Sequence, residues 1–285
     1  MIRALWQEMR PRQWTKNVLV YAAPAFKGVL FDAGAALLAT EAFFAFCLVA
    51  SGIYFWNDIF DVEADRAHPT KRFRPVAAGR IPMPAAYVAA AALLAGGLVL
   101  AYAVNAACCG LIASYVVVNI AYTLRLKHVV ILDVMIVAYG FVVRAVLGAA
   151  ATGVGTTAWF LLCVLFLSLF LALGKRRHEL QEIERGARPR GRKVLQYYSL
   201  GLIDQFMTIA TTALLMCYAL FAIDAPDHAR MALTIPLVLY GMFYYLYLVR
   251  VRQEGGAPDE MLYRAKPILC VVALYVLCIV AFRNV

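Results

Sequence analysis

Long apolar stretches alternate with short polar segments along the whole chain of 285 residues. An α-helix needs about 20 apolar residues to cross the hydrocarbon core of a bilayer. The first apolar run is the shortest and contains Pro24, and Trp14 and Lys16 form an interfacial anchor near its start. The pattern predicts an all-α, polytopic membrane protein in which residues 1–285 form a single integral membrane domain. Its nine predicted transmembrane helices are 15–31, 36–56, 84–104, 107–125, 129–151, 157–174, 202–223, 230–249 and 266–283.

The composition agrees with this class. Of all residues, 64% are hydrophobic and only 15% are charged, whereas about a quarter are charged in soluble domains. The seven cysteines all fall within predicted helices without the spacing of metal ligands, which indicates small core residues. The four histidines are scattered, so we expect no zinc site.

Basic residues predict the orientation, because lysine and arginine accumulate in cytoplasmic loops. Most of the 27 lysines and arginines lie before residue 17 or in four polar loops. These facts predict a cytoplasmic N-terminus, an outside C-terminus and no cleaved signal peptide, since the N-terminal apolar run lacks a small-residue cleavage site. Topology thus explains the net charge of +10, and no nucleic-acid partner is needed. The predicted cytoplasmic loops are 57–83, 125–130, 175–200 and 250–265.

A dense acidic segment follows the second apolar run. Asn57, Asp61 and Asp65 are spaced at i, i+4 and i+8, which places them on one stripe of a helix, with Asp58 beside them and Tyr54 one turn earlier. Oxygen-bearing side chains that point the same way suit a hard cation such as Mg²⁺. A solvated helix end is the simpler alternative, but the density of acidic side chains favours a magnesium site.

Basic side chains flank this stripe and another loop. Lys71, Arg72 and Arg74 come directly after the stripe and suit anionic oxygens. Lys175 and Arg176, at the end of the sixth helix, suit a ligand in the same way. The pattern at residues 175–185 predicts a short amphipathic helix over a cavity mouth. Residues 186–193 predict a flexible basic turn, which either takes part in the site or is a topology-setting loop that binds anionic lipid headgroups. Lys16 either reaches lipid headgroups or binds a phosphate, and its position leaves both open.

A second polar cluster surrounds the start of the fifth helix. The fourth helix ends in Y-T-L-R-L-K-H, which includes Tyr122 and Lys127, and Asp133 opens the next helix. Arg144 lies inside the apolar run, on the same face as Asp133, and a charge at that depth is a functional candidate. An ion pair with a carboxylate of the second helix is the alternative. Because both clusters follow even-numbered helices, we expect two helix-pair units to face each other across a central cavity open to the cytoplasm.

The stretch N-D-I-F-D-V-E-A-D, Asn57 to Asp65, resembles the N-D-x-x-D-x-x-x-D motif of the UbiA superfamily of intramembrane prenyltransferases. The chain departs from that family at the second acidic motif, where Asp133 is followed by Val137 instead of another aspartate. Further segments resemble its decaprenyl-phosphate phosphoribosyltransferase branch. They are R-P-R-Q-W-T-K-N-V-L-V, D-R-x-H-P-x-K-R-x-R-P, Y-T-L-R-L-K, G-K-R-x-x-E and A-P-D-E-M-L-Y-R.

The resemblance implies an enzyme of a bacterial inner membrane. It implies transfer of 5-phosphoribose from phosphoribosyl pyrophosphate (PRPP) to a polyprenyl (decaprenyl) phosphate, with release of pyrophosphate, for cell-wall biosynthesis. Together with the spacing, it implies three sets of residues. The magnesium ligands are Asn57, Asp58, Asp61 and Asp65, and the catalytic residues are Asp58, Asp61 and Asp133. The substrate-binding residues are Lys16, Tyr54, Asn57, Lys71, Arg72, Arg74, Tyr122, Lys127, Arg144, Lys175 and Arg176.

Two other functions compete with this interpretation. An aromatic prenyltransferase, which attaches a polyprenyl chain to a quinone or haem precursor, requires a second acidic pair near residue 137 that the sequence lacks. A non-catalytic lipid transporter is expected to carry polar residues at mid-membrane in paired repeats, whereas here they cluster on one side. The sequence leaves the length of the lipid chain and the oligomeric state open.

Overall fold

The computed structural model describes residues 1–186, 193–225, 227–254 and 265–283, and the regular secondary structure in these residues is entirely helical. The chain divides into two compact units, Met1–Lys127 with Val143–Thr156, and His128–Val142 with Thr157–Val285. Seven helices in the described part are long and apolar enough to cross a membrane. One helix, α7 (Leu132–Thr152), contributes residues to both units.

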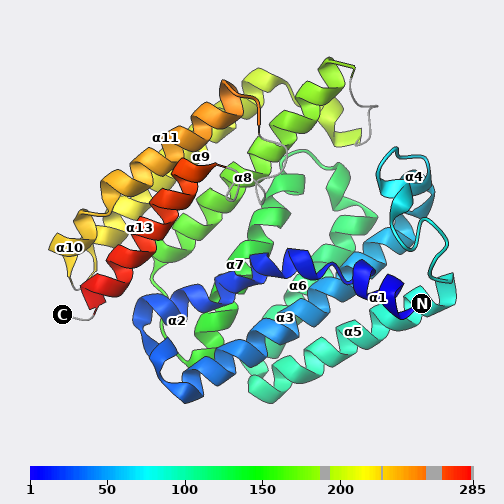
Figure 1. Cartoon of the computed structure of the whole chain (residues 1–285), viewed down its shortest axis with the longest axis horizontal. Coiled ribbons are helices and arrows are strands. Elements are labelled where there is room, and N and C mark those ends of the chain that lie inside the picture. The colour runs from blue at the N-terminus through cyan, green and yellow to red at the C-terminus, as the bar shows by residue number, and fades with distance from the viewer. Residues whose placement is uncertain (187–192, 226, 255–264, 284–285) are drawn as a thin grey trace. The chain divides into compact units, whose positions relative to one another are not determined.

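The first unit is built around α3, which packs against α5 along its length (Figure 1). Small residues permit this close approach: a Cβ added to Gly97 would lie 2.5 Å from the Val49 side chain and 2.8 Å from the Ala45 carbonyl oxygen. Such contacts between small residues are typical of membrane helices. Besides its part of α7, the unit contains α1 (Ile2–Glu8), α2 (Ala22–Lys27), α3 (Ala33–Phe60), α4 (Val62–Arg66), α5 (Met83–Val104) and α6 (Ala106–Leu124).

Polar side chains fix where the long helices begin. Asp32 accepts a hydrogen bond from the Ala35 amide at 2.8 Å and caps α3, and Asn105 accepts one from the Cys108 amide at 2.8 Å and caps α6. Such caps satisfy amide groups that have no partner inside a helix. The predicted helices 84–104 and 107–125 are confirmed to within one residue, as α5 and α6.

The predicted helix at 15–31 is wrong as a single α-helix. The chain instead forms a 3₁₀ helix, Pro11–Tyr21, then α2, and a short 3₁₀ turn, Val29–Phe31. Pro24 has no amide hydrogen to continue an i to i−4 ladder across this region. Gly28, with φ of 74°, ends α2 in the left-handed conformation that glycine tolerates.

The N-terminal segment nevertheless runs antiparallel to α3 (Figure 1). The Trp14 indole donates to Ser51 Oγ at 3.1 Å, and the Tyr21 hydroxyl donates to Thr40 Oγ1 at 3.1 Å. Arg10 reaches Asp58, still nearer the end of α3. At 1.5 Å per residue, these contacts extend over roughly 27 Å of helix, which is close to the thickness of the bilayer core.

Besides its part of α7, the described residues of the second unit form four long helices, one short α-helix and the 3₁₀ helix Lys193–Tyr197. Its core includes Phe170, Ile203, Met207 and Leu248, which are all fully or almost fully buried. The helix predicted at 230–249 is divided before Pro236, where the proline ring is tolerated in the first turn of the second piece. These elements are α8 (Ala158–Glu184), α9 (Leu200–Ile223), α10 (His228–Ala232), α11 (Ile235–Arg250) and α13 (Lys266–Arg283).

The sixth predicted helix is also longer than expected. Helix α8 continues without a break through residues 175–184, so the predicted separate amphipathic helix is the last part of α8. Arg176, Arg177 and Glu179 are buried there and form ion pairs, which makes this polar stretch part of the core. Most of the predicted basic turn at 186–193 and the stretch A-P-D-E-M-L-Y-R lie outside the described residues.

Candidate active site

The acidic segment lies where α3 meets α4. Helix α3 ends at Phe60, and Asp61 sits between the two helices with φ of −94° and ψ of 10°. The predicted continuous stripe is therefore bent, although the Asp61 amide still donates to the Asn57 carbonyl at 2.9 Å and the Asp65 amide to the Asp61 carbonyl at 2.8 Å. The bend separates Asp61, whose side chain is 38% exposed, from Asp58 and Asp65, which are 2% exposed.

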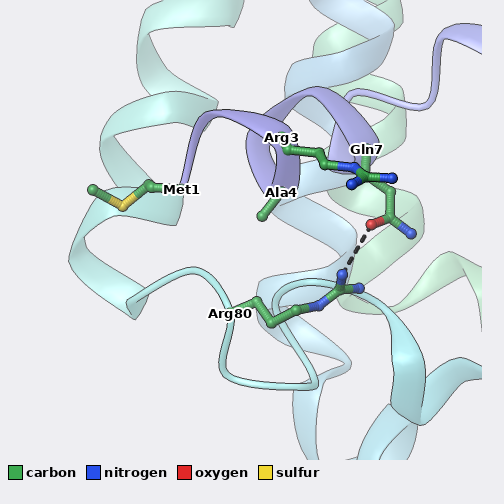
Figure 2. Close-up of a pocket in the computed structure, with 5 residues that line it drawn as sticks. All are labelled: Met1, Arg3, Ala4, Gln7 and Arg80. Atoms are coloured by element: carbon green, nitrogen blue, oxygen red, sulfur yellow. Dashed lines mark hydrogen bonds between the residues drawn. The ribbon is translucent and has the colours of Figure 1, made fainter.

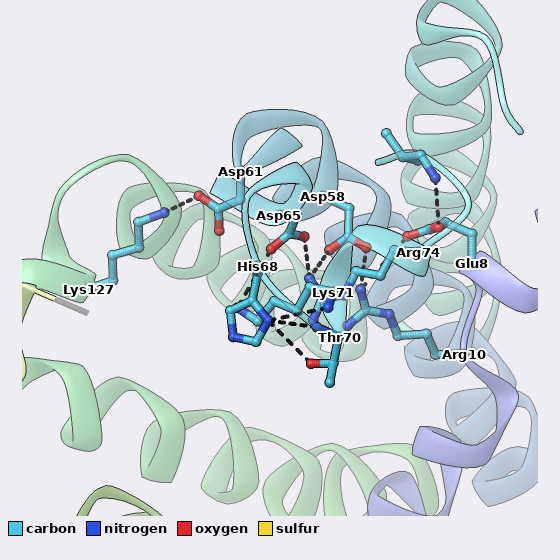
Figure 3. A network of polar contacts seen from close by, with 11 residues as sticks. Glu8, Arg10, Asp58, Asp61, Asp65, His68, Thr70, Lys71, Arg74 and Lys127 are labelled. Carbon is cyan, nitrogen blue, oxygen red and sulfur yellow. Dashed lines mark hydrogen bonds and ion pairs between the residues drawn. The ribbon is translucent and has the colours of Figure 1, made fainter. Parts of the chain in front are cut away.

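Asp58 and Asp65 share one arginine. Arg74 Nη1 donates to Asp58 Oδ1 at 3.0 Å and to Asp65 Oδ2 at 2.6 Å, and Lys71 Nζ lies 3.6 Å from Asp65 Oδ1 (Figure 3). A buried carboxylate is stable only when a partner compensates its charge. The basic residues that follow the acidic stripe in the sequence thus fold back and pair with its carboxylates.

Asp61 and Asn57 have partners from the end of α6 and from the turn that follows it. Lys127 Nζ donates to Asp61 Oδ1 at 2.6 Å, and the Thr123 hydroxyl donates to Asn57 Oδ1. The structure therefore brings the first acidic cluster and part of the predicted second polar cluster together within one unit. Asp61 and Lys127 both keep exposed side-chain surface, 38% and 19%, so a ligand can reach this pair.

Arg10 is a site residue that was not among those predicted from the sequence. Its guanidinium bonds Asp58 and lies 4.9 Å above the centre of the Tyr54 ring. Its backbone is in the left-handed region, with φ of 54°, directly before Pro11. Such a conformation is strained in a residue other than glycine and persists where its surroundings determine it. Its place in the stretch R-P-R-Q-W-T-K-N, which carries part of the family resemblance, is the feature of the sequence that could have identified it.

Glu8 lies next to this cluster, with its Oε1 3.8 Å from Arg10 Nη2, and is 1% exposed. The Val76 amide donates to Glu8 Oε2 at 3.4 Å. Burial, followed by a hydrogen bond with Asp58 and the charge of Asp58, raises the pKa of Glu8 to about 8. Glu8 is therefore mainly neutral at pH 7, and the cluster holds three carboxylates against four cations, Arg10, Lys71, Arg74 and Lys127.

This pKa predicts how stability depends on pH. The pKa of Glu8 rises from 4.5 to about 8 on folding, so between these values the folded state keeps a proton that the unfolded state has lost. Stability from this group is complete below pH 4.5 and is lost as the pH rises toward 8. We expect Glu8→Gln to flatten that decline in thermal unfolding measured in detergent. Glu63→Gln, an exposed control, should keep the wild-type decline, and an unchanged decline in Glu8→Gln contradicts the assignment.

Arg144 is buried, with 6% exposure, and its predicted function in binding the substrate stays a prediction. Its Nε donates to Asn17 Oδ1 at 2.8 Å, and its guanidinium lies over the rings of Phe46 at 4.4 Å and Tyr115 at 5.4 Å. Aromatic faces stabilise such a cation. The hydrogen-bond acceptor is thus an amide of the N-terminal segment and not a carboxylate of α3.

Asp133, in the second unit, is completely buried in a polar network. Its Oδ2 accepts from Arg176 Nε at 2.7 Å and its Oδ1 from the Tyr198 hydroxyl at 2.7 Å, while Arg176 Nη1 donates to Glu179 Oε2 at 2.9 Å. The Tyr198 oxygen also accepts from the Ile131 amide at 2.8 Å. These contacts hold Asp133 and Arg176 in place at the start of α7 and the end of α8, and the catalytic function of Asp133 and the substrate-binding function of Arg176 stay predictions.

Tyr198 holds an unusual backbone conformation in place. Ile131 is β-branched and has φ of 72°, which costs energy unless neighbouring groups compensate. Tyr198→Phe leaves the Ile131 amide and Asp133 without this partner, so we expect a loss of about 1–3 kcal/mol of stability. Thermal unfolding measures the loss. The exposed neighbour Tyr197 is the matched control, and equal stability of Tyr198→Phe and Tyr197→Phe contradicts the function assigned to Tyr198.

The other predicted site residues differ in how far they are exposed. Lys16 and Tyr122 are half-buried, and Lys175 is exposed on α8 next to the buried Arg176. Arg72 is exposed and lies 4.8 Å over the Phe73 ring.

The oxygen ligands of the acidic cluster fit magnesium in their chemistry. Carboxylate and amide oxygens are hard ligands, and Mg²⁺ is usually held by one or two carboxylates together with water and substrate phosphates. Among the described residues, no three histidine, cysteine, aspartate or glutamate side chains form a ready-made metal cage. This arrangement suits an ion that shares its coordination with a phosphorylated substrate.

Comparisons with known proteins agree with this picture. A family model, the UbiA prenyltransferase family, matches residues 19–266. The decaprenyl-phosphate phosphoribosyltransferase of Mycolicibacterium smegmatis is 44% identical over 91% of this chain and 85% of that protein. The enzyme of the same name from Corynebacterium glutamicum is 40% identical over 98% and 85%.

Solved structures show the same fold. A UbiA homologue from Archaeoglobus fulgidus, bound to GPP and Mg²⁺, superposes with a TM-score of 0.73 and 17% identity, and covers 99% of this chain and 100% of its own. The same homologue bound to Cd²⁺ gives a TM-score of 0.71 at 18% identity, over 99% of this chain and 100% of its own. At this identity the likeness concerns the fold alone.

Proposed function

Since the chain belongs to the UbiA prenyltransferase family, we propose that it transfers 5-phosphoribose from PRPP to a polyprenyl phosphate and releases pyrophosphate. One observation carries the choice of donor: four cations surround three charged carboxylates at the acidic segment. PRPP has a pyrophosphate on C1 and a phosphate on O5, whereas a prenyl diphosphate is anionic at one end only. A site for PRPP therefore needs additional cations instead of a second acidic motif.

Asn57, Asp58, Asp61 and Asp65 would hold Mg²⁺ in this proposal. When bound, the ion supplies positive charge to the leaving pyrophosphate. Guanidinium and ammonium groups bind phosphate oxygens well. The side chains that we assign to the phosphates of the donor are Arg10, Lys71, Arg74 and Lys127.

In the transfer, an oxygen of the acceptor phosphate forms a bond with C1 of the ribose, and the bond from C1 to the pyrophosphate oxygen breaks. The acceptor is already an anion, so no general base is required. Catalysis then rests on positioning and on stabilising the charge of the leaving group. Asp58 and Asp61 would act on the diphosphate through the Mg²⁺ that they hold. We assign Asp133 a structural function instead of a catalytic one.

Further residues complete the proposed donor and acceptor sites. Tyr54 and Arg144 line the donor side through their neighbours Arg10 and Asn17. We assign Lys16 and Lys175 to a phosphate of the acceptor or donor because both are cationic and keep exposed surface. Arg72 and Tyr122 remain candidates for the donor.

We further propose nine membrane crossings: the N-terminal segment along α3, the seven apolar spans and α13. The basic residues favour a cytoplasmic N-terminus and acidic site, with the C-terminus outside a bacterial inner membrane. In that arrangement water-soluble PRPP reaches the site from the compartment where it is available, and the lipid acceptor arrives through the bilayer.

A paired assay tests the reaction. The purified protein receives Mg²⁺ with either labelled PRPP and a polyprenyl phosphate, or labelled prenyl diphosphate and 4-hydroxybenzoate. We expect label in the lipid product of the first pair only. Product from the second pair alone supports the aromatic prenyltransferase and rejects this proposal.

A further inference from the structure

A cavity lies beside α1 and is lined by none of the residues of the acidic cluster. It has a volume of about 480 Å³ and is lined by Met1, Arg3, Ala4, Gln7 and Arg80 (Figure 2). Gln7 Oε1 accepts a hydrogen bond from Arg80 Nη1 at 3.1 Å. The lining carries two guanidinium groups and no carboxylate, so the cavity attracts anions.

The elements that line this cavity also carry exposed apolar side chains. On α1, Ile2 is 85% exposed and Trp6 55%, and Phe73, whose carbonyl bonds Arg80, is 63% exposed. Exposed apolar and tryptophan side chains beside arginine are unfavourable in water but typical of a helix that lies in the headgroup region of a bilayer. A ligand of this cavity is therefore expected to be both anionic and lipidic.

We propose that Arg3 and Arg80 bind the headgroup phosphate of an anionic phospholipid, whose acyl chains lie against Ile2 and Trp6. A zwitterionic lipid fits less well, because its own cation competes with the two guanidinium groups for the phosphate. A soluble phosphate compound does not use the apolar surface. Charge and apolar surface together thus select the lipid, and this inference is independent of the transfer reaction.

Binding at this place would affect the neighbouring loop. Arg80 Nη2 donates to the Phe73 carbonyl at 2.7 Å, and Phe73 is the last residue of the 3₁₀ turn Lys71–Phe73. The next residue, Arg74, bridges Asp58 and Asp65. A phosphate shared by Arg3 and Arg80 therefore ties α1 to the loop that supplies cations to the acidic site, and the lipid should stabilise the fold.

The experiment uses the full chain in a neutral detergent. Short-chain phosphatidylglycerol is titrated while the unfolding temperature and the dissociation constant are measured, with phosphatidylcholine of the same chain length and inorganic phosphate as comparisons. The test variant is Arg3→Gln/Arg80→Gln, which keeps hydrogen-bond donors but removes both charges. Arg12→Gln is the matched control, because Arg12 is exposed on the same segment and does not line the cavity.

We expect phosphatidylglycerol to stabilise the wild type and Arg12→Gln, and phosphatidylcholine and phosphate to have little effect. Each lost arginine should weaken binding about fivefold, and the double variant about 25-fold. Equal binding by the double variant and the wild type overturns the site, as does an equal loss in Arg12→Gln. Displacement of phosphatidylglycerol by farnesyl phosphate at equal concentration also overturns it, because the cavity would then belong to the acceptor. Should the double variant unfold, Arg3→Gln alone must show the fivefold loss.

Discussion

Replacing Asp61 by asparagine should reduce the transfer rate from PRPP by about 100-fold or more. The substitution keeps the shape of the side chain and removes the charge that pairs with Lys127 at 2.6 Å. It also removes the most exposed carboxylate of the acidic cluster, which a magnesium–diphosphate ligand can reach most directly. Steady-state transfer of label from PRPP to a polyprenyl phosphate measures the effect.

Glu63→Gln is the matched control for this substitution. Glu63 lies two residues further along, its side chain is 83% exposed, and it pairs with Arg66 at 3.0 Å. We expect this variant to retain the wild-type rate. If Asp61→Asn and Glu63→Gln have the same rate, Asp61 has no function in holding the donor.

Gly148→Ala should have the largest effect on folding. A Cβ at this position would lie 1.6 Å from the Val20 carbonyl oxygen, and backbone atoms cannot move aside as a flexible side chain can. The contact fixes the N-terminal segment against α7 within the first unit. We expect a loss of more than about 3 kcal/mol, or no folded protein. Yield of monodisperse protein and thermal unfolding measure it.

Gly110→Ala on α6 provides the comparison, because a Cβ there meets nothing within 4 Å. A helix generally gains stability when alanine replaces glycine, so this variant should be at least as stable as the wild type. If Gly148→Ala unfolds at the wild-type temperature, the close packing of Val20 on Gly148 is wrong.

Long apolar helices could be predicted well from the sequence, while the N-terminal segment could not. In α5 and α6 the length of the apolar run decides the structure, so hydropathy and the observed bounds agree. Between Pro11 and Phe31 the apolar composition predicts a helix in the membrane, but it does not predict whether that helix is an α-helix or a 3₁₀ helix. Its 3₁₀ geometry depends on Pro24, Gly28 and packing against α3, which hydropathy does not describe.

The candidate site shows the same division. Asp58, Asp61 and Asp65 could be identified because their spacing is local, and the family resemblance together with the spacing identified Lys71 and Lys127. Arg10 lies 48 positions from Asp58 in the sequence, and its function depends on the N-terminal segment folding back to the end of α3.

The partners of Asp133 are equally distant. Arg176 lies 43 positions from it and Tyr198 lies 65, and both donate hydrogen bonds to its buried carboxylate. Helical periodicity places residues on a face of their own helix only. Contacts between helices far apart in sequence had to come from the structure.

The central claim is that the acidic cluster and its four cations bind a donor with phosphate at both ends. Calorimetric titration of the wild-type protein with PRPP, pyrophosphate and geranyl diphosphate, each with Mg²⁺, tests it most directly. We predict that PRPP binds at least tenfold more tightly than pyrophosphate, and that geranyl diphosphate does not displace it at equal concentration. Equal affinity for PRPP and pyrophosphate, or displacement by geranyl diphosphate, would contradict the claim.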